Sequence, residues 1–351
     1  MKIAVGCDRS MIDYLHIDAV IDSMGHDSKI FITNSFLEDC SYLNKKKDEF
    51  GLHATHNKYD VAKFVEIKNI IDSFAPDVLF FIDLPTKILT FERFQEIVKL
   101  CKNKGTAIVV FFVNTLKDRT SALKYLSLCN VVVSFDQEDV NYLEKILAVP
   151  TFYSPVGYSE ECELTKFDPQ ISRPIDVSFI GSAWKFRLKI LEALSNYSIN
   201  NGKVCRIFGP MIDVKYFWKL PLFKLKFPNL SQCLVNRSVS LLEAGEICSK
   251  SKICINLHLG EQSSPNPRTF LILASGALQL IDERLHYSGL TLGVDLVKFN
   301  GIENLIELVD YFLNHDEDRT AIARNGWRKV VPKFRLSNCL EKIFGVAKMR
   351  E

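Results

Sequence analysis

The chain has 351 residues, a formal net charge of +2 and a pI near 8.0. This length predicts about two domains, and the near-neutral charge lacks the strong positive field typical of nucleic-acid-binding domains. Hydrophobic residues make up 47% and charged residues 25% of the chain. These values are typical of a packed globular protein and argue against a disordered one.

In the first half, short apolar strands alternate with helical patterns, which predicts parallel βαβ units. The expected strands are residues 2–5, 29–33, 77–82, 107–113 and 130–134, with a short one near residue 153. The expected helices are residues 12–24, 61–74, 91–102 and 138–147. We therefore expect a Rossmann-like domain over residues 1–155.

Residues 154–174 contain three prolines and no hydrophobic period. We interpret residues 156–175 as a linker and residues 176–335 as a second Rossmann-like domain. Its expected strands are residues 176–180, 204–208, 253–257 and 278–281, and its helices include 185–196 and 241–249. Residues 336–351 are expected to form a C-terminal helix whose apolar spacing permits packing on the first domain.

Ten cysteines are scattered singly, without a C-x-x-C pair. Some, such as Cys254, lie in apolar runs, where cysteine usually acts as a small hydrophobe. The pattern predicts a reducing compartment, and hence a cytoplasmic location, without a disulfide framework or zinc site. We expect neither a signal peptide nor a transmembrane helix. His53 and His56 form H-x-x-H without further ligands at metal spacing, so no metal is expected there.

The most informative stretch is residues 249–283, which reads as two buried strands joined by a helix. Asn266, Arg268 and Thr269 stand at the start of that helix, and Gly276 ends it. A helix N-terminus offers free N–H groups to phosphate oxygens, and an arginine can add bidentate contacts. The stretch therefore predicts a site for the diphosphate of a nucleotide-activated donor.

Three motifs of this stretch resemble a known family. They are S-K-I-x-x-N-x-H from Ser251, N-x-R-x-F from Asn266 and A-x-G-A-x-Q-L-x-D-E from Ala274. Residues 304–326 are similar to the family's closing pattern, and residues 179–187 to the strand and turn that open its second domain. Residues of about 150–340 thus resemble the C-terminal half of CgeB-like, group 1 type glycosyltransferases.

The resemblance implies an α/β GT-B fold, in which two Rossmann-like, doubly wound domains face a central cleft. Ligands of open α/β sheets bind beyond the carboxyl ends of the strands. The residues then expected to bind the donor are Gly181, Ser182, Arg187, Gly209, Asn256, His258, Asn266, Arg268, Thr269, Gly276, Asp282 and Glu283. On the first domain the strand-end candidates are Gly6, Asp8, Asp83 and Asn114.

Other interpretations stay open for several of these residues. Asn266 and Thr269 could be helix caps alone, and Arg268 could form a surface salt bridge. His258 could be a core histidine with satisfied ring nitrogens. Gly6 and the Gly181-Ser182 pair could simply mark turns.

One departure from the family concerns the donor ribose. Leu271 stands where the resemblance implies a ribose-binding glutamate, and Ser263 stands near the position of its upstream partner. Glu261, Asp282 or Glu283 could hold the ribose instead. This puts the donor's identity in question more than the fold.

The predicted function is transfer of a sugar from a nucleotide-diphosphate donor to a glycan or lipid-linked acceptor in surface polysaccharide or glycoconjugate synthesis. The resemblance implies that no metal cofactor is required. Asp8, His16 and Asp83 are candidate catalytic bases, although Asp8 could cap a helix and His16 could pack within one. Alternatives are a catalytically silent nucleotide- or sugar-binding protein and a sugar-nucleotide epimerase. Inverting and retaining chemistry both remain open.

Residues 214–227 interleave apolar residues with Lys215, Trp218, Lys219, Lys224 and Lys226. Basic and aromatic residues together favour an anionic membrane interface, and aromatic rings also stack on sugars. We hypothesise a peripheral contact of Lys215–Phe227 with the inner membrane face. The alternative is a partly buried loop.

Overall fold

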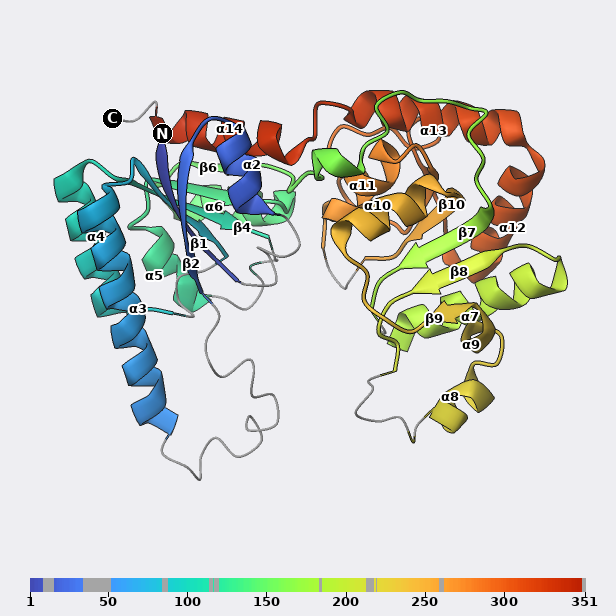
Figure 1. The fold of residues 1–351 in the computed structure, drawn as a ribbon, viewed down its shortest axis with the longest axis horizontal. Helices are drawn as coiled ribbons and strands as arrows, with labels where there is room; N and C mark the ends of the chain where they lie inside the picture. Colours follow the sequence, from blue (N-terminus) through green and yellow to red (C-terminus); the bar gives the residue numbers. More distant parts are fainter. Residues whose placement is uncertain are drawn as a thin grey trace. The chain divides into compact units, whose positions relative to one another are not determined.

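The structure is a computed structural model that describes residues 1–8, 16–33, 52–83, 88–113, 116, 120–182, 185–212, 218, 220–258 and 262–348, with backbone alone at 52–59, 120 and 185. The chain divides into two compact units (Figure 1). Unit 1 consists of Met1–Val156 and Leu336–Glu351, and unit 2 is Gly157–Arg335.

Unit 1 is built on a sheet of six parallel strands in the order β2-β1-β3-β4-β5-β6. The strands are β1 (Lys2–Cys7), β2 (Asp27–Ile32), β3 (Val78–Ile82), β4 (Ala107–Phe112), β5 (Val131–Ser134) and β6 (Thr151–Tyr153). Every residue of β3, β4 and β5 is buried. Their continuous apolar sequences fit this position, because both faces of a parallel sheet are covered.

Alternate strand residues of unit 1 enter two separate cores. Leu79 and Phe81 pack with α3 (Leu52–Phe74), α4 (Phe91–Lys104), η3 (Thr120–Ala122) and α5 (Leu123–Leu126). Val78 and Phe80 pack with α2 (Ile17–Ser23) and α14 (Leu336–Lys348). Helix α6 (Gln137–Ile146) follows β5.

The C-terminal helix α14 belongs to unit 1 although the chain reaches it through unit 2. Leu340, Ile343 and Phe344 are buried in the core beside α2 and β3. The ring of Phe344 meets that of Phe80 edge-on, with centroids 5.2 Å apart. The helix thus ties both ends of the chain into one core, as its apolar spacing permits.

Unit 2 repeats the plan with a second sheet of parallel strands, in the order β12-β11-β10-β7-β8-β9. The strands are β7 (Ile175–Ile180), β8 (Cys205–Phe208), β9 (Leu234–Val235), β10 (Ser251–Asn256), β11 (Leu278–Ile281) and β12 (Val297–Lys298). The helices are α7 (Lys185–Asn200), α8 (Leu220–Lys226), α9 (Leu230–Cys233), α10 (Leu241–Ser249), α11 (Pro267–Ala274), α12 (Gly301–Asn314) and α13 (Asp316–Val330).

The helices of unit 2 also cover both faces of its sheet. Residues of α7, α9 and α12 pack on one face with Val177, Ile253 and Leu280. Residues of α10 and α11 contribute to the cores of the other face, where Cys254 and Ile272 meet. The sheet is therefore doubly wound, and its carboxyl edge is open for polar side chains.

The segment that follows Val156 packs against unit 2. A short 3-10 helix, η4 (Glu160–Cys162), lies against α10, and Cys162 is buried with Phe270. The Glu163 carboxylate accepts hydrogen bonds from the Tyr158 hydroxyl at 2.7 Å and from Nε of Arg335 at 2.9 Å. The prolines of this segment interrupt any hydrophobic period, which is why the sequence suggested a linker. Its contacts nevertheless make residues 157–174 part of unit 2.

Several local expectations need correction. Gly6 lies within β1, where an added Cβ would stand 2.5 Å from the ring of Phe31, so close packing and not a turn requires the glycine. His16 is exposed and precedes α2 in a left-handed conformation, so it does not pack within a helix. Residues 220–226 form the helix α8, with no buried residue, instead of a partly buried loop.

Other expectations fall outside the described residues. They concern Asn114, Glu261, Lys215 and Lys219, together with the side chains of His53 and His56. Among the described helices none is long and apolar enough to cross a membrane.

Candidate functional site

A group of interlocked polar side chains lies at the carboxyl edge of the second sheet. It is built where β10 ends at Asn256, where β11 ends before Asp282, and where α11 begins after Asn266. These two strands are hydrogen-bonded neighbours, with Asn256 paired to Ile281. The βαβ connection therefore brings together residues that stand 25 positions apart.

Asn266 caps α11 and Pro267 occupies its first turn. The Asn266 Oδ1 atom accepts a hydrogen bond from the backbone N–H of Thr269 at 3.2 Å. This confirms the capping interpretation of Asn266. Since proline has no N–H and the Thr269 N–H is engaged, this helix start has few backbone donors left for an anion. Side chains must supply most of any anion binding.

Asn256 connects that cap to the strand. Its Nδ2 atom donates to Asn266 Oδ1 at 3.1 Å and to Thr269 Oγ1 at 3.0 Å. Its Oδ1 atom accepts from Arg268 Nη1 at 3.3 Å. The side chains of Asn256 and Thr269 are fully buried. The guanidinium of Arg268 is thus fixed at the helix start by a rigid, buried amide.

His258 is almost fully buried, and both of its ring nitrogens are hydrogen-bonded. Nε2 accepts the backbone N–H of Asn266 at 3.0 Å, so Nδ1 carries the proton and donates to Asp282 Oδ1 at 2.6 Å. The backbone N–H of His258 donates to the other carboxylate oxygen at 3.0 Å. This confirms the interpretation of His258 as a satisfied core histidine that positions the start of α11.

The pKa values of this pair fit that arrangement. Burial lowers the pKa of His258 below its ordinary 6.5, and this outweighs the opposing bond and charge of Asp282. Burial works to raise the pKa of Asp282, but the His258 hydrogen bond and the charge of Arg284 outweigh burial and lower it. Neutral histidine beside ionised aspartate is therefore the stable state near neutral pH.

Arg284 belongs to the group, although the sequence analysis did not single it out. Its Nη2 atom is 3.3 Å from Asp282 Oδ2, and its Nη1 atom donates to the Gln262 carbonyl at 2.6 Å. A signal was present, because the arginine stands two residues after the strand-end aspartate. A charged triplet after a buried strand is usually interpreted as a solvated turn.

Arg187 is the most buried cation of the site, with only 2% of its surface exposed. It joins the ends of β7 and β10 by donating to the carbonyls of Ser182 at 3.1 Å and Leu257 at 2.5 Å. Its Nε atom is buried and has no hydrogen-bond partner among the described residues. A buried N–H without a partner costs about 1–3 kcal/mol, so this donor is suited to an incoming acceptor.

Two guanidinium groups therefore lie near each other at this edge. Burial, and then the charge of Arg268, lower the pKa of Arg187 to about 10, while Asp282 opposes the shift. The group remains a cation at neutral pH. Repulsion between the two cations favours binding of an anion beside them.

Gly181 and Gly209, which follow β7 and β8, are in close contact. An added Cβ at Gly209 would stand 1.9 Å from the Gly181 carbonyl oxygen, and Gly209 has φ +146°. A Cβ at Gly181 would stand 3.4 Å from Arg187 Nη1. Position 209 therefore needs glycine for the close approach of the two backbones, and at position 181 a Cβ would stand 2.8 Å from the ring of Phe179.

Three residues that were expected to bind the sugar donor lie away from this group of side chains or only at its margin. Gly276, with φ +69°, ends α11 at the amino edge of the sheet. Glu283 is exposed and its carboxylate is 2.9 Å from Nζ of Lys298. Ser182 is exposed and contributes its carbonyl oxygen. Leu271, at the expected ribose position, is buried in the apolar core with Phe270.

On unit 1 the candidate bases lie at the carboxyl edge of its sheet. Asp8 follows β1 and Asp83 follows β3, and the parallel register places the two residues at the same level. Asp83 has φ +72° and His16 has φ +47°, both in the left-handed region that side chains rarely adopt. Such backbone strain often accompanies functional positions.

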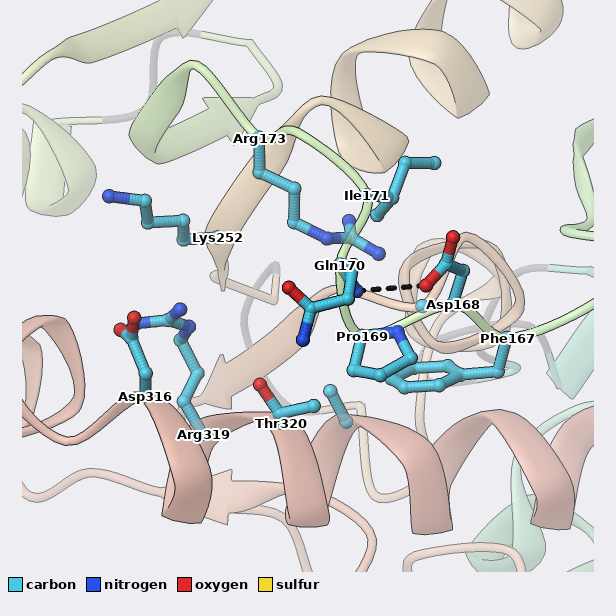
Figure 2. A pocket seen from close by; sticks show the side chains of 12 residues that line it. Phe167, Asp168, Pro169, Gln170, Ile171, Arg173, Lys252, Asp316, Arg319 and Thr320 are labelled. Atoms are coloured by element: carbon cyan, nitrogen blue, oxygen red, sulfur yellow. Dashed lines mark hydrogen bonds and ion pairs between the residues drawn. The ribbon is translucent and has the colours of Figure 1, made fainter.

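A separate pocket of about 180 Å³ lies at the opposite, amino edge of the second sheet (Figure 2). Its charged side chains are already engaged. Arg173 donates to the carbonyls of Ser249 at 2.8 Å and Ser251 at 3.1 Å, and Arg319 pairs with Asp316 at 2.5 Å. Arg173 thus ties the carboxyl end of α10 to the start of β10, and we assign the pocket no role in chemistry.

Asp316 and Asp318 have the spacing of a D-x-D metal motif, but they lie in the first turn of α13. The first pairs with Arg319, and the second accepts a hydrogen bond from the Tyr311 hydroxyl at 2.5 Å. Among the described residues no group of three histidine, cysteine or carboxylate side chains could hold a metal ion.

A sequence model of the family described as glycosyl transferase-like matches residues 187–345. The spore protein CgeB of Bacillus subtilis (strain 168) is 20% identical over 320 residues, which span 87% of this chain and 94% of CgeB.

Solved structures share the fold over nearly the whole chain. A glycosyltransferase from Rickettsia africae ESF-5 superposes with a TM-score of 0.64 at 13% identity, covering 99% of this chain and 98% of that one. Anabaena HepE, in complex with UDP-glucose, gives 0.63 at 9% identity, covering 99% and 100%. The fold is therefore the two-domain α/β fold of GT-B glycosyltransferases.

The family match and the CgeB relative confirm the resemblance found in the sequence. Residues 187–345 are similar to the glycosyl transferase-like family, and most of the chain is similar to CgeB. The matched residues include Arg187, the β10–α11–β11 segment and the start of α14.

Proposed function

We propose that this glycosyltransferase moves a sugar from a nucleoside-diphosphate donor to a glycan or lipid-linked acceptor. The donor diphosphate would lie at the carboxyl edge of the second sheet, between Arg187 and Arg268. The structure of HepE, which has the same fold, contains bound UDP-glucose. UDP is therefore the first nucleotide to test. Synthesis of a surface polysaccharide or glycoconjugate is the proposed setting.

One observation carries this proposal: two guanidinium groups converge at a buried strand edge, and one of them has a donor without a partner among the residues that the structure describes. Arginine suits a phosphate because its planar N–H groups can make paired bonds to two oxygens. The Asn256 amide holds Arg268, and two backbone carbonyls hold Arg187. Both cations are thus oriented before a ligand binds.

This geometry bears on the leaving group. When the bond between the sugar and the diphosphate breaks, negative charge grows on the diphosphate. Fixed cations in a site with little water stabilise that charge without reorganising. We therefore propose that the reaction needs no metal cofactor, with Arg187 and Arg268 acting on the departing oxygens.

The acceptor hydroxyl needs a base if the enzyme inverts configuration. Asp8, His16 and Asp83 are the proposed candidates on unit 1. Asp8 and Asp83 are favoured because they follow neighbouring strands at the same level of the sheet. We also propose a cytoplasmic location. Nine described cysteines are free and buried, which fits a reducing compartment.

The first experiment measures nucleotide binding by thermal shift with UDP, GDP, CMP, TDP and ADP, each with and without Mg²⁺. A ligand that binds only the folded state raises the melting temperature. We expect one diphosphate to stabilise the wild type and Arg206→Ala, whose side chain is exposed on β8. The same nucleotide should fail to stabilise Arg268→Ala, and equal shifts in the two variants would refute the proposed site.

A catalytically silent nucleotide-binding protein is the second candidate. It is favoured by Leu271, whose burial leaves no carboxylate at the expected ribose position. Nucleotide binding without release of UDP from UDP-sugars, across a panel of acceptors, would support it. Turnover of a UDP-sugar in the absence of any acceptor would instead favour an epimerase.

A further inference from the structure

Helix α8 exposes apolar side chains that a core-facing helix would bury. Leu222 is 66% exposed and Leu225 is 79% exposed. They stand three residues apart and so share one face of the helix. Trp218, just before α8, is 59% exposed. Single exposed apolar residues are common, but several within one short segment indicate an interaction surface.

The opposite face of α8 is the one that packs on the protein. Phe223 and Phe227 contact each other, with ring centroids 5.2 Å apart, and pack against the core of unit 2. A helix turns roughly 100° per residue, so Leu222 and Leu225 point away from these rings. Lys224 and Lys226 then flank the outward leucines on both sides.

Hydrogen bonds hold the surroundings of α8 in place. The Asn236 Oδ1 atom accepts from the backbone N–H of Met211 at 2.8 Å and of Ile212 at 2.9 Å, which joins the two ends of the connection between β8 and β9. The Glu192 carboxylate accepts from the backbone N–H of Leu230 at 2.8 Å. These bonds fix the segments on either side of α8. The helix lies at the periphery of unit 2, next to α9 (Figure 1), with the two leucines pointing outward.

The charge of this part of the chain is one-sided. Residues 214–242 contain no aspartate or glutamate but four lysines and one arginine, whereas the whole chain has a net charge of +2. Lys224 and Lys226 are both exposed on α8. A second copy docked on the same face would bring like charges together, which disfavours self-association. An anionic partner matches this surface.

We propose that α8 is a docking surface for an anionic lipid membrane. Leu222 and Leu225 enter the boundary between headgroups and acyl chains, and Lys224 and Lys226 contact lipid phosphates. This inference goes beyond the donor site and does not depend on which nucleotide binds there. It would hold the enzyme where a lipid-linked acceptor is concentrated.

The test is flotation of the full-length protein with vesicles of phosphatidylglycerol and phosphatidylcholine in equal parts, and with phosphatidylcholine alone. Wild type should float only with the anionic vesicles. Leu222→Ser with Leu225→Ser, and separately Lys224→Gln with Lys226→Gln, should each reduce binding by about tenfold or more. Raising the salt to about 0.5 M should release the wild type, because screening weakens the lysine contacts.

Matched controls use exposed residues elsewhere in unit 2. Leu285→Ser changes a leucine that is 75% exposed, and Lys166→Gln with Lys329→Gln removes two exposed charges. Both controls should float like the wild type. All α8 variants should keep the wild-type melting temperature and nucleotide shift, so a failure of the donor site would be seen separately.

Three outcomes would overturn the proposal. The wild type could fail to float with anionic vesicles. The α8 variants could float as well as the controls. Light scattering could reveal a dimer that Leu222→Ser with Leu225→Ser dissociates while no vesicle binding occurs, which would assign the surface to a second copy of the chain.

Discussion

The two sheets of this protein are both six-stranded and parallel, but they differ in strand order and at their carboxyl edges. In unit 1, β1, β3 and β4 end in the buried residues Cys7, Ile82 and Phe112. Asp8, Asp83 and Asp136 lie just after β1, β3 and β5. In unit 2, β10 ends in a buried asparagine that joins a histidine, an aspartate and the start of α11 in one network.

This difference teaches where specificity resides in a repeated fold. The sheet and its covering helices need only apolar periodicity, which both units supply. The edge of unit 2 carries an interlocked group of buried polar side chains, which are costly unless paired. Most of their polar atoms are paired with one another. Nε of Arg187, which has no partner among the described residues, lies where we propose the donor.

The largest effect that would test this comparison is expected for Arg268→Ala. Loss of a fixed cation beside the leaving group should lower kcat/KM for the sugar donor by about 10²–10³-fold. Arg206→Ala serves as the control and should keep wild-type kinetics. Comparable kinetics for both variants would mean that the carboxyl edge of the second sheet does not bind the donor diphosphate.

Close approach of β7 and β8 at the same edge is tested by Gly209→Ala. The new Cβ would collide with the Gly181 carbonyl, so we expect a loss of about 3 kcal/mol in the free energy of unfolding, measured with urea. Gly202→Ala also has positive φ but open space around it, and should cost about 1 kcal/mol. Equal costs would show that the contact is not needed.

The variants Asp8→Asn, Asp83→Asn and His16→Asn test whether the carboxyl edge of unit 1 supplies the general base. One of these should reduce sugar transfer about 100-fold, as for loss of a general base, while the nucleotide thermal shift is unchanged. Asparagine tolerates the left-handed backbone of positions 16 and 83, so a folding defect is not expected. If all three variants retain full turnover, the base lies elsewhere or the reaction retains configuration.

A smaller effect concerns pH and the His258–Asp282 pair. Because the folded-state pKa of His258 is lowered, the unfolded chain binds the extra proton first, and stability should fall as pH drops below about 6.5. Asp282 contributes in the same direction only below its ordinary 3.8. His258→Gln should reduce the loss of melting temperature between pH 7.5 and 5.5, taken as rough limits around that pKa.

The exposed His315 supplies the control for that measurement. His315→Gln should keep the wild-type pH profile of melting temperature. An unchanged profile in His258→Gln as well would mean that burial of His258 does not contribute to acid sensitivity.

The smallest expected effect is that of a chelator. Since the proposed site stabilises the diphosphate with two arginines, EDTA treatment should leave the rate of sugar transfer unchanged within error. A large loss of activity that Mg²⁺ or Mn²⁺ restores would contradict the proposed role of the arginines, and would require ligands for a metal near the diphosphate.

Most of the elements that were predicted from the sequence lie close to the observed ones, although α3 begins at Leu52 and not at residue 61. β11 and α10 occur at the predicted residues, and most other predicted strands and helices differ by one or two positions. The short strands β9 and β12 were not predicted. Two residues give no hydrophobic period, and only pairing with β8 and β11 makes them strands.

The candidate site was predicted in part. Position after a strand or before a helix pointed to Asn256, Asn266 and Arg268, because the carboxyl ends of parallel strands meet at one edge. The sequence pattern does not distinguish that edge from the amino edge for a helix-ending glycine such as Gly276. It also does not show that Asp282 is hydrogen-bonded to His258, since the two residues are 24 positions apart.

Apolar periodicity and a few strand-end motifs were enough to predict the two-domain α/β class and the resemblance to glycosyltransferases, because they describe contacts between neighbours in the sequence. The tertiary structure alone decided that α14 returns to unit 1 and that Leu271 is a core residue. It also decided that Arg187 is buried, with one donor that has no partner within the described part of the chain. These facts depend on contacts between distant residues, whose partners no local pattern of residues specifies.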